Sequence, residues 1–337
     1  MRLFARLRLR YEAVANPGRA MSNSIVAVFG GSGFLGRYVV TALARADYRI
    51  RVGVRRPNLA NFLLPLGKVG QIQLVKASIL DPAQTAAVID GADAVVNLVG
   101  ILRQSGRQKF ARVHRDAPGA LARQALDAGA ATFVHVSAMG VSASAPAEYA
   151  RTKAEGETAV REAFPAATIF RPSLLIGPED DFFNRFAGIA RVSPFLPLIG
   201  GGRTRFQPVY VADAAAAVVR GVEDPAGTRG RTFELGGPSV YTFKELMQLM
   251  LREICRKRAL VPVPFGLAAA GAAVTGWLPF APLTLDQVRL LKTDNVMTKG
   301  ALGLNDLGIE PDVLESILPK YLWRFRPEGQ FQPARAA

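Results

Sequence analysis

The sequence predicts an α/β fold with a doubly wound parallel sheet and a smaller C-terminal lobe. Short apolar runs alternate with helix-like segments through the first half of the 337 residues, which is typical of parallel strands joined by right-handed crossovers. A glycine-rich loop, Gly30 to Gly36, follows the first apolar run and opens the first helix-like segment. Dinucleotide-binding sheets of the Rossmann type carry their phosphate loop at this place.

The pattern of apolar residues predicts each element in turn. Strands are expected at Ile25–Phe29, Arg49–Val54, Ile72–Lys76, Ala94–Val99, Thr132–Val136 and Thr168–Ile176. Helices are expected between them at Phe34–Ala46, Gln84–Ile89, Phe110–Ala128 and Lys153–Phe164, with a kink at Pro118. Arg203–Val211 and Arg231–Leu235 are expected to return to the sheet as strands.

These elements divide the chain into parts. Residues 23–178, with 203–237 returning, are expected to form the nucleotide-binding domain, and residues 179–202 and 238–327 the lobe. Residues 1–22 read as a basic extension, with targeting as the alternative, and 328–337 as a tail.

Asp213 is expected to cap a helix at 214–222, and Thr242 with Glu245 to form a capping box before a helix that reaches Cys255.

Composition limits the possible functions. The single cysteine excludes an intramolecular disulfide and a cysteine-based zinc cluster, and two isolated histidines argue against a histidine-based metal site. No metal site is therefore predicted. The net charge of +15 fits an anionic membrane or an acidic protein surface as a partner, or a merely solvated basic face. No nucleic-acid partner is predicted, because no basic stripe interleaved with aromatic residues is present.

Residues 259–285 contain no charged residue, and a stretch of this length raises the question of a membrane span. Four prolines interrupt the stretch, and its middle consists mostly of alanine and glycine. A span is therefore not expected. A short helix that lies on a membrane or a partner, and a buried helix of the lobe, both remain open.

The glycine loop predicts a pyrophosphate site. Gly30 allows the tight turn, Gly33 removes a Cβ where a phosphate approaches, and Gly36 permits close packing of helix on strand. Phe34 and Leu35 stand at the mouth of the helix, whose free N–H groups attract anions. A plain tight turn is the structural alternative.

Two arginines at the end of the second strand predict which dinucleotide binds. NAD-preferring sites usually place an acid there to accept the ribose hydroxyls, whereas this chain has Arg55 and Arg56. Guanidinium groups suit a 2′-phosphate, so NADP(H) is preferred and NAD(H) is possible. Asp81 after the third strand is expected either to receive the adenine amino group or to cap the next helix.

Ser137, Tyr149 and Lys153 form a candidate catalytic set. Tyr149 and Lys153 are four residues apart, which places them on one helix face. The ammonium is expected to lower the pKa of the phenol and prepare it for proton exchange during hydride transfer, while Ser137 polarises the same carbonyl. His135, inside an apolar run, is expected to be structural. The set serves either catalysis or only the holding of a nucleotide.

These motifs resemble the extended short-chain dehydrogenase/reductase superfamily, over about residues 24–240. The carriers are the glycine loop, Ser137, the Tyr149–Lys153 motif, and Arg171-Pro172 after the sixth strand. A narrower resemblance, from Met21 to about Pro327, is to the dehydrogenase-like 39 kDa-type accessory subunit of respiratory complex I and its bacterial relatives. It is carried by VAVFGGSGFLGRYVV, the segment from YARTK to FFNRFA, RFQPVYVADAAAA and LTLDQVRLLKTDNV.

The narrower resemblance implies an accessory or assembly protein with a tightly held, structural NADP(H). It implies that Gly30, Gly33, Gly36 and Arg55 bind the nucleotide and that Tyr149 and Lys153 hold the ribose. It also implies a respiratory or quinone-related membrane complex as partner. The location would be cytoplasmic, on the inner face of the inner membrane of a bacterium, or on the matrix side in a mitochondrion.

Two alternatives remain at this point. One is a free NADP(H)-dependent oxidoreductase or epimerase that uses Ser137, Tyr149 and Lys153, with a role in ubiquinone biosynthesis as one possibility. The other is a sensor of the NADP(H) redox ratio. His114 stands where many extended relatives have asparagine, and Pro118 follows it. Both departures from the pattern of the extended relatives count against independent catalytic turnover by this chain.

Overall fold

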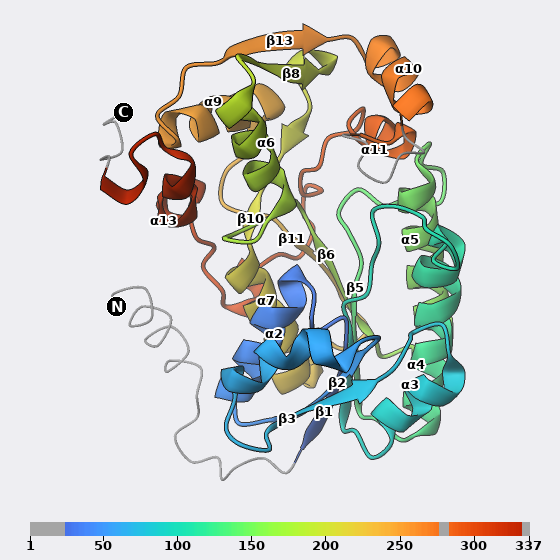
Figure 1. Cartoon of the computed structure of the whole chain (residues 1–337). Coiled ribbons are helices and arrows are strands. Elements are labelled where there is room, and N and C mark those ends of the chain that lie inside the picture. The colour runs from blue at the N-terminus through green and yellow to red at the C-terminus, as the bar shows by residue number, and fades with distance from the viewer. Residues whose placement is uncertain (1–23, 276–282, 332–337) are drawn as a thin grey trace.

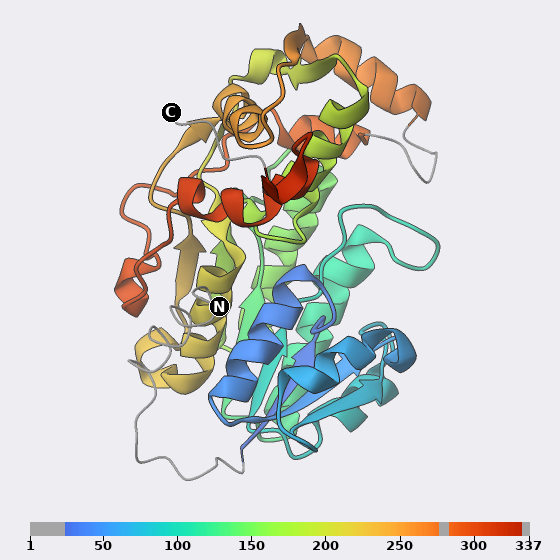
Figure 2. The same ribbon diagram turned by 60° about the vertical axis from the view of Figure 1, so that its left-hand side comes forward.

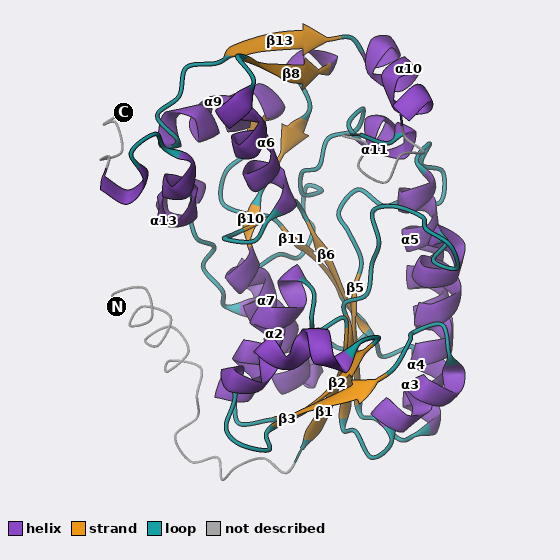
Figure 3. Cartoon of the chain, viewed as in Figure 1, coloured by secondary structure: helices purple, strands orange, loops and turns teal. Residues whose placement is uncertain are grey.

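A computed structural model describes residues 24–275 and 283–331. The predicted extension at 1–22 and most of the predicted tail therefore lie outside the described residues. The predicted α/β class is confirmed: one sheet forms a central layer with helices on both faces (Figure 1; Figure 3).

The central sheet has seven strands, all parallel, in the order β11-β6-β5-β4-β1-β2-β3. Its order from β3 through β1 to β6 is that of the doubly wound dinucleotide-binding sheet. Both faces of the strands are covered, which explains why they appear in the sequence as continuous apolar runs. The strands are β1 (Ile25–Phe29), β2 (Arg49–Val54), β3 (Ile72–Lys76), β4 (Ala94–Asn97), β5 (Thr132–Val136), β6 (Thr168–Pro172) and β11 (Thr232–Leu235).

Helices form a layer on each side of the sheet (Figure 1). One layer contains α2 (Phe34–Arg45) and α7 (Val211–Glu223), and the other contains α3 (Pro82–Ile89), α4 (Ala117–Asp127) and α5 (Glu148–Ala163). The two layers enclose separate apolar cores, with Val28 of β1 in one core and Phe29 in the other. This alternation along a single strand fixes the register of β1 in the sheet.

A smaller lobe lies beyond the carboxyl ends of the strands (Figure 1; Figure 2). Its strands β8 (Phe195–Ile199) and β13 (Ala259–Val263) pair in parallel, and the predicted capping box of Thr242 and Glu245 begins α9 (Phe243–Glu253). The lobe contains α6 (Asp181–Val192), β8 (Phe195–Ile199), β12 (Tyr241–Thr242), α9 (Phe243–Glu253), β13 (Ala259–Val263), α10 (Phe265–Thr275), α11 (Leu285–Leu290), α12 (Leu314–Ile317) and α13 (Pro319–Leu322).

The prediction of one returning strand at Arg203–Val211 is wrong, whereas the second return, at β11, is confirmed. The first segment forms two short strands outside the main sheet, β9 (Arg205–Phe206) and β10 (Val209–Tyr210). Pro208 between them has no N–H to donate to a ladder. The long sixth strand also divides after Pro172, because β7 (Leu175–Ile176) leaves the sheet to pair with β10.

Three helix predictions need correction. The helix that carries Lys153 begins at Glu148 rather than at Lys153, so that it also carries Tyr149. Asp213 does not cap α7, which begins at Val211; its buried carboxylate accepts a hydrogen bond from the backbone of Asp312. The disturbance expected at Pro118 takes the form of a π-helical turn, η2 (Ala111–Asp116), immediately before α4.

Candidate functional site

The glycine loop has backbone geometry that side chains do not permit. Gly30 has φ of +82°, and a Cβ on Gly36 would lie 2.1 Å from the carbonyl oxygen of Gly30. A Cβ on Gly33 would meet only that carbonyl oxygen, at 3.2 Å. Gly30 and Gly36 are therefore required for the loop itself, whereas the exposed Gly33 leaves its outer side open to a ligand.

The N-terminus of α2 remains available to an anion. Gly33 is the N-cap residue, no side chain caps the helix, and its first turn contains no acid. The free N–H groups of a 12-residue helix thus face outward with a partial positive charge. Leu35 packs into the core and Phe34 is half-buried, so the backbone of this turn, rather than its side chains, is suited to phosphate.

A cavity of about 370 Å³ adjoins the loop. Both predicted arginines, Arg55 and Arg56, line it and are exposed, and Ser32 of the glycine loop contributes to its wall. The remaining lining residues are Val54, Leu59 and Ala60. The structure therefore brings the loop and the two guanidinium groups to one hollow, with a serine hydroxyl that the sequence analysis did not single out.

Asp81 caps the next helix, which was one of its two predicted roles. Its Oδ1 atom accepts hydrogen bonds from the backbone N–H groups of Ala83, at 3.1 Å, and Gln84, at 3.2 Å. These bonds satisfy two of the unpaired donors at the start of α3. Contact with an adenine remains a prediction.

Ser137, Tyr149 and Lys153 occupy the space between β5 and α5. Ser137 directly follows β5, and its buried Oγ atom has no hydrogen-bond partner in the described chain. Lys153 is only 3% exposed, and its Nζ atom donates to the carbonyl oxygen of Val136 at 3.0 Å. Serine and ammonium are thus held beside the same stretch of chain at the end of β5.

The expected lowering of the Tyr149 pKa does not occur. Burial raises the pKa of Tyr149 to about 12, because desolvation disfavours the phenolate. The ring packs edge-on against Phe110 and His114, with centroids 6.0 and 5.2 Å away. Burial also lowers the pKa of Lys153 to about 8, an effect that Glu157 opposes.

His114 fixes the π-turn against α5. Its Nε2 atom accepts a hydrogen bond from the backbone of Ile101 at 3.1 Å, and Nδ1 lies 3.3 Å from the hydroxyl of Thr152. These partners assign the proton to Nδ1. Burial and the charge of Lys153 lower the pKa of His114 to about 3, so the ring is neutral. A Cβ on Gly156 would lie 1.8 Å from the His114 carbonyl oxygen, which shows how closely α5 packs on this turn.

His135 has the buried position that the sequence predicted, at 1% exposure. Its Nδ1 atom lies 3.2 Å from the Nδ2 atom of Asn97, whose amide therefore donates to the ring. Burial and the charges of Lys153 and His114 lower the pKa of His135 well below its ordinary value. The buried Nε2 atom has no partner in the described residues.

Asp286 is a site residue that the sequence analysis missed. Its carboxylate, on α11 of the lobe, accepts hydrogen bonds from the backbone N–H groups of Glu148 and Tyr149. A helix that lacks its own capping side chain is thus capped from another part of the fold. The capping box of Thr284 and Gln287 is a local signal for a helix there, but it does not reveal the contact.

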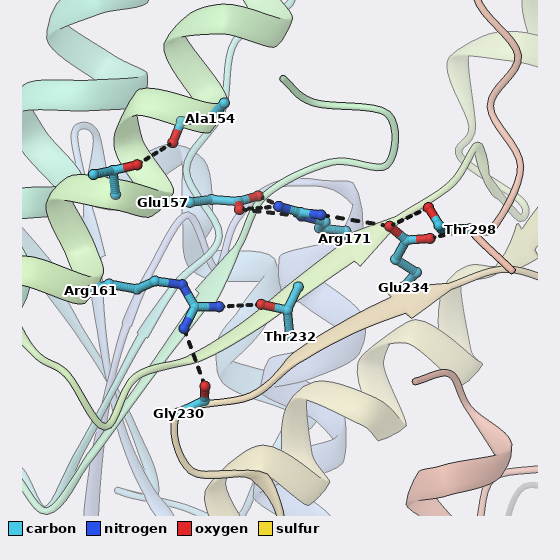
Figure 4. A network of polar contacts seen from close by, with 9 residues as sticks. Ala154, Glu157, Arg161, Arg171, Gly230, Thr232, Glu234 and Thr298 are labelled. Atoms are coloured by element: carbon cyan, nitrogen blue, oxygen red, sulfur yellow. Dashed lines mark hydrogen bonds and ion pairs between the residues drawn. The ribbon is translucent and has the colours of Figure 1, made fainter. Parts of the chain in front are cut away.

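A network of charged side chains, with two buried glutamates joined by the partly exposed Arg171, was also missed (Figure 4). Glu157, one turn after Lys153 on α5, forms a bidentate ion pair with Arg171 of β6. Arg171 in turn lies 3.6 Å from Glu234 of β11. The Arg171-Pro172 motif therefore joins the helix of the candidate site to the edge of the sheet.

The apolar stretch at 259–285 forms β13, α10 and part of α11, with 276–282 outside the described residues. The side chains of Leu267 and Val274 on α10 are 68% and 73% exposed, while Ala272 is buried. Across the described ranges, no helix is both long enough and apolar enough to cross a bilayer.

Comparison with known families identifies the fold and its loop. Residues 26–236 match the NAD dependent epimerase/dehydratase family. The chain belongs to this family. The match extends from β1 to the residue after β11 and includes the glycine loop, both arginines of the cavity, Ser137, Tyr149 and Lys153.

This epimerase/dehydratase family member also has relatives that match most of its length. It is 37% identical over 325 residues to NADH dehydrogenase (ubiquinone) 1 alpha subcomplex subunit 9, mitochondrial, of Arabidopsis thaliana, covering 93% of this chain and 81% of the relative. It is 32% identical over 257 residues to a ceramide reductase of Caulobacter vibrioides, covering 76% and 79%. The predicted resemblance to the complex I accessory subunit is thereby confirmed.

Solved structures of the same fold include a dTDP-glucose 4,6-dehydratase from Streptomyces venezuelae with NAD bound. Its TM-score is 0.68 at 20% identity, over 91% of this chain and 98% of that one. At this identity the likeness is one of fold alone.

Proposed function

We propose that the protein binds NADP(H) as an accessory or assembly subunit of a complex I-like NADH:ubiquinone oxidoreductase, with a mainly structural role for the nucleotide. The observation that carries the proposal is the uncapped N-terminus of α2, which opens beside the cavity lined by Arg55 and Arg56. The similarity to the Arabidopsis NADH dehydrogenase (ubiquinone) subunit supports this choice of partner.

The preference for NADP(H) over NAD(H) follows from the charges of this cavity. Two exposed guanidinium groups and the Ser32 hydroxyl can each donate hydrogen bonds to a 2′-phosphate. No carboxylate lines the cavity to receive free ribose hydroxyls. Charge-assisted hydrogen bonds to a phosphate are among the stronger polar interactions in proteins, so the phosphorylated nucleotide is favoured.

A structural role for the nucleotide is supported by the state of Tyr149. Its pKa is raised to about 12 by burial, which makes the phenolate scarce near neutral pH. Lys153 contacts the carbonyl oxygen of Val136 and has two further N–H donors for ribose hydroxyls. The π-turn at 111–116 and the His114 contacts fix the neighbouring helix.

The lobe supplies a surface suited to a membrane arm and its anionic lipids. The lobe exposes Val192, Phe195, Val261, Leu267 and Val274, which are between 42% and 87% exposed. Exposed Arg191 lies on α6 beside Val192, and exposed Lys257 shortly precedes β13. Exposed apolar residues accompanied by cations are typical of surfaces that lie on anionic bilayers. The location would be the cytoplasmic face of a bacterial inner membrane, or the matrix side in a mitochondrion.

Purification from native membranes tests the proposal. A tagged chain should copurify with NADH:ubiquinone oxidoreductase subunits after mild solubilisation and retain NADPH through dialysis. A double variant, Leu267→Ser with Val274→Ser, should lose the membrane association while it keeps the nucleotide. Recovery of the whole protein from the soluble fraction, with no membrane subunit attached, would contradict the proposal.

A second candidate function is a free NADP(H)-dependent reductase or epimerase. The unpartnered Ser137 Oγ beside Lys153 favours it, as does the ceramide reductase among the relatives. A role in ubiquinone biosynthesis belongs to this candidate. The Tyr149→Phe variant decides between the two: function should survive in an accessory subunit and disappear in a reductase.

A further inference from the structure

Four charged side chains alternate in sign from the candidate nucleotide site to the edge of the sheet, and Figure 4 shows three of them, Glu157, Arg171 and Glu234. The Nε and Nη2 atoms of Arg171 donate to Oε1 and Oε2 of Glu157 at 2.9 and 2.6 Å. The Nη1 atom of Arg171 lies 3.6 Å from Oε1 of Glu234. Lys153 begins the series, one helical turn before Glu157, and the two side chains are 3% and 5% exposed.

The far end of the network is held by the loop after α11. Oε2 of Glu234 accepts a hydrogen bond from the backbone N–H of Thr298 at 2.7 Å, and Oε1 accepts one from its hydroxyl at 3.3 Å. Both carboxylates are thus fully engaged. Carboxylates held by this many donors are fixed in position.

The surroundings of Lys153 contain one anion within the described parts of the chain. His114 from η2 and His135 from β5 face it, and both are neutral because their pKa values are lowered. Tyr149 on its own helix has a raised pKa and is neutral. Arg171 from β6 lies beyond Glu157. Only Glu157 opposes the loss of the ammonium charge on burial.

We propose that Glu157 is a positioning residue that keeps Lys153 charged for the nucleotide, and that Arg171 and Glu234 hold Glu157 in place for this task. The inference rests on the proposed nucleotide binding. It assigns a role to side chains that do not themselves touch the ligand. An ammonium at Lys153 offers hydrogen-bond donors to the ribose and attracts the anionic dinucleotide, whereas a neutral amine is a weaker donor and supplies no charge.

The sign of the expected pH dependence follows directly. The protonated form of Lys153 binds, so affinity is lost as the pH rises through its pKa, which is about 8 with Glu157 present. Without the carboxylate, desolvation acts unopposed and the pKa falls further. The loss of affinity then begins at a lower pH.

Calorimetric titration of the full-length protein with NADPH between pH 6.5 and 9 tests this role. The affinity of the Glu157→Gln variant for NADPH should be nearly equal to that of wild type at pH 6.5 and roughly 5-fold lower than that of wild type at pH 8. The phosphate of the nucleotide titrates equally in both measurements, so its effect cancels in the ratio of variant to wild-type affinity. Glu157→Asp keeps the charge and should follow wild type. Glu155→Gln is the matched control, because Glu155 lies on the same helix and pairs with Arg115 at 3.6 Å near the surface.

Three outcomes would overturn the proposal. A loss in Glu157→Gln that is the same at every pH would show a role in folding alone. A further loss when Glu157→Gln is added to Lys153→Met would show that Glu157 does not act through Lys153. If Glu157→Gln does not fold, the pH dependence of NADPH affinity in wild type decides the question. The affinity of wild type must decline near pH 8, and this decline must be absent in Lys153→Met. Failure of wild type to bind nucleotide at any pH would instead overturn the proposed function, and this inference with it.

Discussion

Oδ2 of Asp286 accepts a hydrogen bond from the backbone N–H of Tyr149 at 3.0 Å, across 137 residues of sequence. Oδ1 of the same carboxylate accepts one from Glu148 at 2.8 Å. One lobe residue therefore caps the helix that carries Tyr149, Lys153 and Glu157. The position of the lobe and the position of the candidate site are linked through this carboxylate.

Replacement of Asp286 by alanine should remove the cap of α5. The expected cost is about 1 kcal/mol of folding free energy, because two N–H donors lose a charged acceptor at a helix N-terminus. Thermal unfolding with and without NADPH measures both this cost and the loss of affinity. Asp224→Ala is the control, since Asp224 caps the short helix α8 (Pro225–Thr228). If the two variants lose the same affinity, the link between lobe and site is contradicted.

Alanine at two glycines of the loop should give opposite results. Gly36→Ala puts a Cβ 2.1 Å from a backbone oxygen, so the loop and α2 cannot keep their packing and stability should fall by several kcal/mol. Gly33→Ala has its nearest contact at 3.2 Å and should fold with a nearly normal melting temperature. Its methyl group occupies the space of a phosphate, so calorimetry should show at least a ~10-fold loss of NADPH affinity. Normal NADPH binding by folded Gly33→Ala would refute the predicted pyrophosphate site.

The two arginines of the cavity should discriminate between nucleotides. Arg55→Ala and Arg56→Ala should each weaken NADPH binding by roughly 10- to 100-fold, which corresponds to the loss of charge-assisted hydrogen bonds. NADH lacks the 2′-phosphate, so its affinity should change little. Titrations of both nucleotides against each variant measure the ratio. Equal losses of affinity for NADPH and NADH would show that the arginines contact a part of the nucleotide other than the 2′-phosphate.

Stability should fall as the solution is acidified below the ordinary pKa of histidine. In the folded protein the pKa of His114 is about 3, lower than in the unfolded chain, so its contribution is present above about pH 6.5 and is lost as pH falls toward 3. The expected limiting slope is about 1.4 kcal/mol per pH unit for this group. Urea unfolding from pH 7 to pH 4 measures it. His114→Asn should show a shallower slope, and an unchanged slope would contradict the assignment.

Much of the nucleotide half could be predicted from local patterns. The strands from Ile25 to Val136 appear as apolar runs, because a parallel sheet buries both faces of each strand. The glycine loop and the position of Arg55 follow from their order along the chain. Asp81 remained ambiguous because one carboxylate can serve a helix cap or a base, and its sequence position is the same in both cases.

Features that depend on contacts between residues far apart in the sequence were not predicted. Asp286 meets Tyr149, and Glu234 meets Thr298, only after the lobe has folded over the sheet. The expected effect of Lys153 on the Tyr149 pKa was wrong for the same kind of reason. Helical spacing places the two side chains on one face, but it does not report how deeply each is buried, and burial decides the sign.

The last strand of the sheet, β11, has a consequence for how the protein can be divided. The chain leaves the sheet after β6, builds α6 and β8 of the lobe, and only then supplies β11 before it enters the lobe again. A fragment cut after β6 would leave an open row of backbone donors and acceptors along that strand, which invites fibril-like association. The nucleotide-binding part and the lobe are therefore not separate segments of the chain, and neither is expected to fold on its own.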